Sequence, residues 1–314
     1  MTGARIPGGC SRVVPFEECR EENGVVIVAR QHLGRPQLHI RFRGQDLARD
    51  RVIARAGEPL TPDHLLRLAE NSWTELQVHR APRVAILCSG SELVEPGGTL
   101  RPGQKISGNS TLLRALTEQE GGRCLLVRTA EDRPEAITAA LGELLAHHPD
   151  LILTTGGMGP GKFDLMERTV LAMQGTVHYN SLRVRPGKST MFAHLAAVPL
   201  FGLPGPPPAV RLLFHELVTI ALRRLRGERS ARPGLQTARL AEPVRSGKSA
   251  HLNLKGAFAC LDQGRLMARP VQGQEIANGI FHLRGKNRLF TPGEDVAIRL
   301  LTSPYFSQTI CRSS

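Results

Sequence analysis

The pattern of apolar and polar positions divides the 314-residue chain into three stretches. In residues 1–80, short apolar runs alternate with glycine and proline, which indicates a β-rich region with turns. The runs are Arg12–Pro15, Val25–Ala29 and Gln37–Phe42. One helix is expected in this region, from Pro62 to Asn71, because Thr61 is a suitable N-cap and proline suits the first helical position.

The pattern changes in residues 81–227, where buried apolar runs alternate with segments of helical periodicity. Arg83–Cys88 and Leu151–Thr155 have the apolar character of buried strands, whereas Pro134–His147 and Pro207–Arg226 have the periodicity of helices. This alternation predicts an α/β domain with three layers, in which helices cover both faces of a mostly parallel sheet.

Residues 228–234 are polar, and short strand-like runs follow them to the end of the chain. Leu235–Leu240, Leu252–Phe258 and Val296–Leu301 are examples. Together with turns such as Pro292-Gly293, they predict a small C-terminal β-barrel over residues 228–314.

Charge and cysteine usage narrow the classes of function. The formal net charge of +13 favours anionic partners, but the aromatic content of 4% offers few faces on which bases could stack. We therefore do not expect a nucleic-acid binder. The six cysteines form no C-x-x-C pair, and no apolar run is long enough to span a membrane. These features predict a soluble, cytoplasmic protein in a reducing compartment.

Glycine-rich and polar loops follow three of the expected strands in the middle stretch. Ligands of open α/β sheets bind beyond the carboxyl ends of the strands, and glycines let the backbone approach a ligand closely. A helix N-terminus after the second loop would offer free N–H groups to an anion. The sequence thus predicts a pocket for a phosphate-bearing ligand, formed by Ser89, Gly90 and Glu92 in the first loop, Gly156, Gly157, Gly159, Gly161 and Asp164 in the second, and Gly205 in the third.

Some of these residues also have plain structural explanations. Asp164 could cap a helix, Glu92 could be a solvated loop carboxylate, and Arg185 and Lys188 could belong to an ordinary basic turn rather than an oxyanion site. Composition gives Asp46 no special role.

The ordered motifs resemble those of the molybdopterin molybdenumtransferases, the MoeA and gephyrin E-domain family. The resemblance extends over nearly the whole chain. It rests on Met1-Thr2-Gly3-Ala4, Arg43-Gly44-Gln45-Asp46, Cys88-Ser89-Gly90-Ser91-Glu92-Leu93, Pro102-Gly103-Gln104, Asn109, Arg185-Pro186-Gly187-Lys188 and Gly202-Leu203-Pro204-Gly205.

The resemblance implies insertion of molybdate into adenylylated molybdopterin, with magnesium present and release of AMP. It implies that Asp46 and Glu92 are the catalytic acidic residues and tentative Mg²⁺ ligands. Arg185 and Lys188 would hold molybdate, while the glycine loop with Asp164, and Asn109, would bind the pterin. It further implies a homodimer, with molybdopterin adenylyltransferase and molybdoenzymes as partners.

This sequence departs from the family pattern at several polar positions. Gly159 replaces a serine, Arg185 replaces a lysine, and the chain starts at the family's M-T-G-A motif, after its D-G-Y-A loop. We therefore expect a weaker dimer, and two alternatives stay open. One is a molybdopterin carrier or sensor without insertion activity; the other is an adenylyltransferase-like activity, because the glycine loop begins T-T-G-G.

Overall fold

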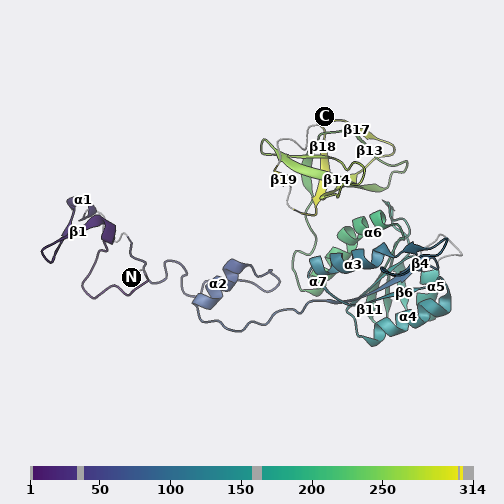
Figure 1. Cartoon of the computed structure of the whole chain (residues 1–314), viewed down its shortest axis with the longest axis horizontal. Helices are drawn as coiled ribbons and strands as arrows, with labels where there is room; N and C mark the ends of the chain where they lie inside the picture. The colour runs from purple at the N-terminus through teal and green to yellow at the C-terminus, as the bar shows by residue number, and fades with distance from the viewer. Residues whose placement is uncertain (1–2, 34–38, 158–164, 303–304, 307–314) are drawn as a thin grey trace. The chain divides into compact units, whose positions relative to one another are not determined.

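The computed structural model describes residues 3–33, 39–157, 165–302 and 305–306. The chain divides into two compact units, shown with their elements in Figure 1. The smaller unit comprises Met1–Arg55 and Leu60–Thr74, and the larger comprises Ala56–Pro59 and Glu75–Ser314. None of the helices in the described ranges is both long and apolar enough to cross a membrane.

The smaller unit contains one two-stranded ladder and the expected helix. Thr61 and His64 form a reciprocal capping box at the start of that helix, with the Thr61 amide donating to His64 Nδ1 at 3.0 Å. The expected strand over Arg12–Pro15 is wrong, and residues 39–42 of the third run also lie outside any strand. The elements are η1 (Phe16–Glu18), β1 (Cys19–Glu22), β2 (Val25–Val28), α1 (Arg30–Leu33) and α2 (Pro62–Glu70).

A six-stranded sheet forms the centre of the larger unit. Its first four strands are parallel, and the last two run antiparallel to their neighbours. In spatial order they are β6 (Arg123–Ala130), β3 (Arg83–Ser89), β7 (Leu151–Thr155), β11 (Val198–Leu203), β10 (Met191–Leu195) and β8 (Thr176–Tyr179).

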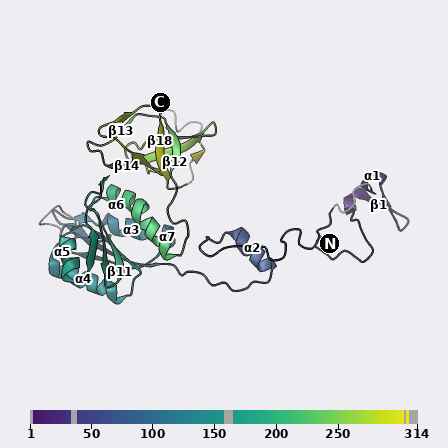
Figure 2. The same ribbon diagram turned by 180° about the vertical axis from the view of Figure 1, so that it is seen from behind.

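Helices cover both faces of this sheet, as Figures 1 and 2 show from opposite sides. Successive side chains of a strand point to opposite faces, so β3 serves two cores. Ile86 packs on one face and Leu87 on the other, and both are fully buried. The first face carries α3 (Gly108–Gln119) and the continuous run of α6 (Pro207–Leu213), η3 (Phe214–Val218, a π-helical turn) and α7 (Thr219–Leu225); the second carries α4 (Pro134–Ala146) and α5 (Leu165–Ala172). The three-layer prediction is confirmed.

A five-stranded barrel follows, as expected. The long strand β14 closes it, because its first half pairs with β16 and its second half pairs with β15. The barrel strands are β12 (Gln236–Leu240), β14 (Leu252–Asp262), β15 (Arg265–Pro270), β16 (Gly279–Leu283) and β18 (Asp295–Leu300). Shorter ladders involve β4 (Leu93–Val94), β5 (Lys105–Ile106), β9 (Val184–Arg185), β13 (Val244–Arg245), β17 (Leu289–Phe290) and β19 (Tyr305–Phe306).

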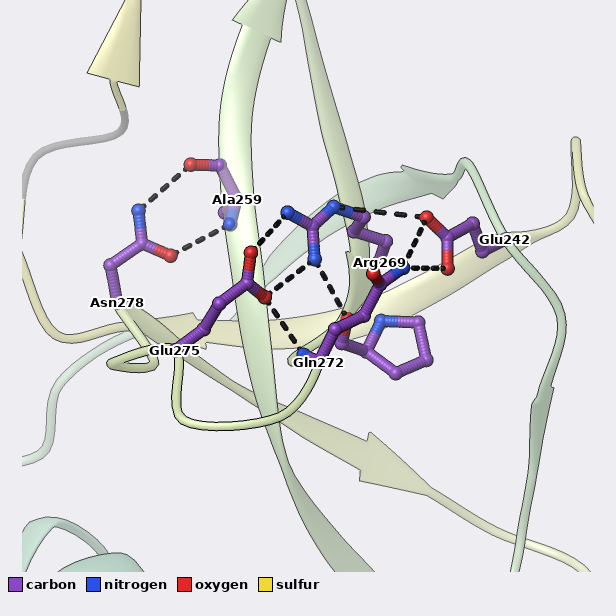
Figure 3. A network of polar contacts seen from close by, with 7 residues as sticks. Glu242, Ala259, Arg269, Gln272, Glu275 and Asn278 are labelled. Carbon is purple, nitrogen blue, oxygen red and sulfur yellow. Dashed lines mark hydrogen bonds and ion pairs between the residues drawn. The ribbon is translucent and has the colours of Figure 1, made fainter. Parts of the chain in front are cut away.

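Polar groups on the barrel strands are paired with side chains from the loops between the strands (Figure 3). Arg269 is only 6% exposed, and its guanidinium makes two hydrogen bonds of 2.7 Å to the carboxylate of Glu275. Glu242 lies on the other side of the same guanidinium, 3.8 Å from its Nε. Asn278 bonds both the amide and the carbonyl of Ala259. The buried charge is thereby compensated, as burial in a low-dielectric interior requires.

A second buried ion cluster joins the long helical run to the barrel. Glu216 on η3 accepts hydrogen bonds from Arg299 Nε at 2.7 Å and from His282 Nε2 at 2.8 Å. Arg299, on β18, is 2% exposed. Burial by itself would raise the pKa of Glu216, but the bonds from His282 and Arg299 outweigh it and lower that pKa to about 2.

Candidate functional site

A pocket of about 830 Å³ lies where the parallel strands β3, β7 and β11 end. The three strands are neighbours in the sheet, so the loops that follow them meet at one edge. Eight of the predicted site residues line this pocket together: Ser89, Glu92, Asn109, Gly156, Gly157, Arg185, Lys188 and Gly205.

The close approach of two of these loops requires glycine at Gly156. Its φ of +91° is a conformation that other residues rarely adopt, and a β-carbon there would overlap the carbonyl oxygen of Ser89. Gly157, with φ of +63°, lies directly against the Ser89 hydroxyl. The end of β7 can therefore pack onto the end of β3 only because both positions lack a side chain.

Asn109 ties the loops together from the first turn of α3. Its Nδ2 donates to the Thr155 hydroxyl at 3.1 Å and to the Gly205 carbonyl at 2.7 Å. Thr155 in turn donates to the carbonyl of Pro204 at 3.1 Å. One amide side chain thus holds the ends of β7 and β11 at a fixed separation.

Polar atoms without a partner lie in the floor of the pocket. The hydroxyl of Ser89, 5% exposed, makes no hydrogen bond in the part of the chain that the structure describes, whereas that of Ser107, 2% exposed, lies against the thiol of Cys88. The Oδ1 of Asn109 is likewise unpaired there. Buried polar groups are normally hydrogen-bonded, so these atoms are suited to meet a polar ligand. The thiol of Cys88 beside them stays protonated, because burial raises its pKa to about 11.

The basic turn on the pocket wall is held by hydrogen bonds to its own carbonyl groups. Thr190 Oγ1 donates to the Gly187 carbonyl at 2.6 Å, and the Leu182 amide donates to the Lys188 carbonyl at 2.9 Å. The bond between Arg185 and Pro186 is cis. Arg185 and Lys188 are exposed and make no ion pair with any described residue. Their charges are free to meet an anion in the pocket.

Glu92, by contrast, is engaged. Lys105 Nζ lies 2.9 Å from its Oε1, and this hydrogen bond holds the pKa of Glu92 below its ordinary value. The pairing follows from the short parallel ladder β4–β5, which also bonds the Lys105 amide to the Glu92 carbonyl. Glu92 is therefore an ionised, partnered carboxylate at the pocket wall.

Sequence reasoning missed several pocket residues, three of which carry polar side chains that matter for the site. Lys105, Ser107 and Asp132 line the cavity, and none was expected there. Asp132 follows β6, the parallel neighbour of β3, so the rule that placed the other loops could have found it. Lys105 and Ser107 belong to the segment that connects β4 to α3. No local sequence pattern indicates that this segment folds back to the pocket.

The remaining predicted residues fall elsewhere. Gly90 does not line the pocket; its amide donates to the Ala130 carbonyl, and the side chain of Leu93 packs against it. Asp46 belongs to the smaller unit and pairs with Arg41 at 3.0 Å. Gly159, Gly161 and Asp164 lie outside the described residues.

Magnesium binding finds no support in the arrangement of side chains. Within the described ranges there is no group of three His, Cys, Asp or Glu residues that could hold a metal ion. Both expected ligands, Asp46 and Glu92, are paired with cations. The described residues do not fit a preformed magnesium site, and no chemical step is derived from one.

Comparison with known proteins gives a consistent result. Residues 85–224 match the family described as a probable molybdopterin binding domain, and residues 1–71 match the MoeA N-terminal region (domain I and II). The molybdopterin molybdenumtransferase of Staphylococcus epidermidis is 28% identical over 99% of this chain and 75% of its own length. That of Staphylococcus aureus is 29% identical over 96% of this chain and 73% of its own.

A solved structure agrees with the sequence matches. The molybdopterin biosynthesis MoeA protein of Pyrococcus horikoshii superposes with a TM-score of 0.76 at 26% identity, covering 96% of this chain and 74% of that one. The shared fold, the two family matches and the near-complete coverage of this chain all indicate the same family. The chain is a homologue of the molybdopterin molybdenumtransferases, the MoeA family.

Proposed function

We propose that this protein binds molybdopterin in the pocket at the ends of β3, β7 and β11 and inserts molybdate into its adenylylated form, releasing AMP. The coarser part of this proposal, a MoeA-like molybdopterin-binding protein of molybdenum cofactor biosynthesis, follows from the homology. The insertion step is inferred for this chain from relatives that are 28–29% identical to it.

One observation carries the proposal. A pocket of about 830 Å³ combines buried hydroxyls among its lining residues with two cations that have no ion-pair partner in the described residues. The hydroxyls of Ser89 and Ser107 can bond a polar ring or phosphate, and Arg185 and Lys188 can neutralise an oxyanion. A ligand with a polar heterocycle and an anionic end matches both features.

The chain's own residues would bind and orient the substrates. Arg185 presents a planar guanidinium and Lys188 a point charge, so together they can hold a tetrahedral oxyanion beside the pterin. Asn109 keeps the loop ends at the separation that the ligand needs. Glu92, ionised and bonded to Lys105, positions that lysine among the residues that line the pocket. Bringing two bound substrates into contact is itself a large part of such catalysis.

The test measures binding and turnover on the same purified chain. Molybdopterin binding is followed by AMP release from the adenylylated form on addition of molybdate and magnesium. The double variant Arg185→Gln/Lys188→Gln should keep pterin binding and raise the molybdate concentration needed for release by about tenfold or more. Arg168→Gln/Arg224→Gln, at two exposed arginines on α5 and α7, removes the same number of charges as the matched control and should change neither. Unchanged molybdate dependence in the Arg185→Gln/Lys188→Gln variant would contradict the assigned role of the turn.

A second candidate function is supported by the pairing of the carboxylates. Since Glu92 is bonded to Lys105 and Asp46 to Arg41, a carrier or sensor that binds molybdopterin without insertion also fits. Pterin binding with no AMP release would establish it. ATP consumption in the presence of molybdopterin would instead reveal an adenylyltransferase-like activity.

We also propose that the chain forms a homodimer through its smaller unit. That unit exposes large apolar side chains, and none of the residues of α2 is buried. Leu65 and Leu66 of α2 are 51% and 57% exposed, and Trp73 is 61% exposed. Exposed apolar patches of this kind mark interaction surfaces. Sedimentation at several concentrations should show association, which Leu65→Asp/Leu66→Asp should abolish.

A further inference from the structure

Cations without acidic neighbours gather on three segments of the larger unit. Residues 180–190, 244–254 and 280–290 contain eight lysines and arginines and no aspartate or glutamate. All eight side chains belong to exposed residues. We call this set the basic strip: Arg183, Arg185, Lys188, Arg245, Lys248, Arg284, Lys286 and Arg288.

Strand pairing brings the three segments together. Arg185 pairs with Asn253 across the β9–β14 ladder, and Asn253 pairs with Leu283 across the β14–β16 ladder. Neighbouring strands lie about 4.8 Å apart, so the backbone of Arg284, next to Leu283, is roughly 10 Å from that of Arg185. The basic strip therefore begins at the pocket wall and continues onto the barrel.

The two barrel loops of the strip are fixed by hydrogen bonds. Ser246 Oγ donates to the Gly285 carbonyl at 2.7 Å, and the Asn287 amide donates to the Gly247 carbonyl at 2.8 Å. Arg245 donates to the carbonyl of Asn287 at 3.1 Å. Because these bonds hold the backbone of both loops, the attachment points of the barrel cations are fixed relative to one another.

Seven of the eight charges of the strip are left without a carboxylate partner in the described ranges. Arg288 pairs with Glu294 at 2.9 Å, whereas the other seven cations have no carboxylate partner in the described ranges. The barrel's buried cations contrast with them, since Arg269 and Arg299 each have a carboxylate at hydrogen-bond distance. Like charges that lie close together on a surface repel one another, and a partner of opposite charge relieves this repulsion.

We infer that the basic strip is the docking surface for a protein partner that presents clustered carboxylates next to the mouth of the pocket. A single small anion does not account for the strip, because its barrel part lies outside the pocket lining and its cations spread over two loops. Single-stranded nucleic acid needs exposed aromatic faces, yet the two phenylalanines of these segments, Phe281 and Phe290, are buried. Charge complementarity sets the partner's position and speeds its encounter. This inference rests on the charge, exposure and strand pairing of the three segments and does not depend on which ligand the pocket binds.

The test uses the full chain and a fluorescent oligoglutamate peptide as the acidic probe. The variant Lys248→Glu/Arg284→Glu/Lys286→Glu removes the barrel part of the strip and leaves the pocket residues intact. The control Arg168→Glu/Arg224→Glu/Arg265→Glu changes the net charge equally, at exposed positions outside the strip. We expect the strip variant to weaken peptide binding by about tenfold or more and the control by less than about twofold, with a steep salt dependence in the native chain.

Other outcomes would overturn the inference. Equal losses in both triple variants would show a general effect of net charge, and no loss in either would show that the strip does not bind acidic protein. Duplex DNA that binds more tightly than the peptide, with the same loss in the strip variant, would assign the surface to nucleic acid. Inorganic phosphate that displaces the peptide at ordinary ionic strength, when equal ionic strength from chloride does not, would assign it to a small anion. Circular dichroism of both variants establishes that each is folded.

Discussion

Cationic side chains differ in their pairing between the interior of the larger unit and the rim of its pocket. Arg299 and Arg269, 2% and 6% exposed, are each bonded to a carboxylate. Arg185 and Lys188, on the exposed turn, have no such partner among the described residues. The paired cations hold strands and helices together, whereas the unpaired ones contribute little to the fold and are available to a ligand. Stability and binding should therefore respond to different residues.

The largest expected effect on the free energy of unfolding comes from breaking the ion cluster of Glu216, His282 and Arg299. Arg299→Ala leaves the buried carboxylate without its main partner, and removing one member of a buried pair costs about 3–5 kcal/mol. Urea denaturation measures the free energy of unfolding. The double variant Glu216→Gln/Arg299→Met should recover much of the loss, because no unpaired buried charge remains. A loss no greater than that of Arg128→Ala, which breaks an exposed pair with Glu143, would contradict this reading.

The neighbouring His215 should make stability depend on pH. Burial, together with the nearby Arg211, lowers its pKa from 6.5 to about 4. In the unfolded chain this histidine therefore binds a proton near pH 6.5, whereas in the native chain it binds one only near pH 4. Stability is present above pH 6.5 and is lost as the pH falls toward 4, by up to about 3 kcal/mol.

His215→Asn isolates that contribution. Free energies of unfolding measured between pH 7 and pH 4.5 should fall less steeply for this variant than for the native chain, since the residue that replaces histidine does not titrate. Glu216, whose pKa lies at about 2, adds its own loss only at lower pH. Equal slopes for the two proteins would show that His215 is not the titrating group.

The α/β body was predictable from sequence because its strands are apolar on both faces. Leu151–Thr155 is a strand at the predicted bounds, and all five of its residues are buried. Arg12–Pro15 failed because a local β-like run becomes a strand only when another strand pairs with it, and none does in the described residues. Propensity is a weak guide where tertiary contacts are few.

The pocket was predictable in part, for a related reason. Ser89, Gly156 and Gly205 follow parallel strands, so sheet topology alone places them at one edge. The bond between Lys105 and Glu92 and the pairing of β9 with β14 depend on how distant segments return to the sheet. No periodicity or spacing encodes such long-range pairings, and only the folded chain reveals them.

Asn109 lies between the two extremes of the comparison, since it serves both the fold and the pocket. Asn109→Ala removes its bonds to Thr155 and Gly205 and should cost about 1 kcal/mol of stability. The larger effect should be on ligand affinity, because Asn109 no longer links the loops that follow β7 and β11. Molybdopterin affinity should fall several-fold, while Asn180→Ala, an exposed asparagine bonded to Glu167, should leave it unchanged. A fall in stability with no fall in affinity would restrict Asn109 to the fold.

The smallest effect on stability is expected at the turn itself, and it is the sharpest test of the comparison. Lys188→Ala removes an exposed cation that has no ion-pair partner in the described residues, so the free energy of unfolding should change by less than about 0.5 kcal/mol. Removing an unpaired positive charge from a chain of net charge +13 also slightly relieves repulsion. The molybdate concentration that supports AMP release should nevertheless rise. If Lys188→Ala instead destabilised the protein as much as Arg299→Ala, the turn would belong to the framework, and the distinction between paired and available cations would fail.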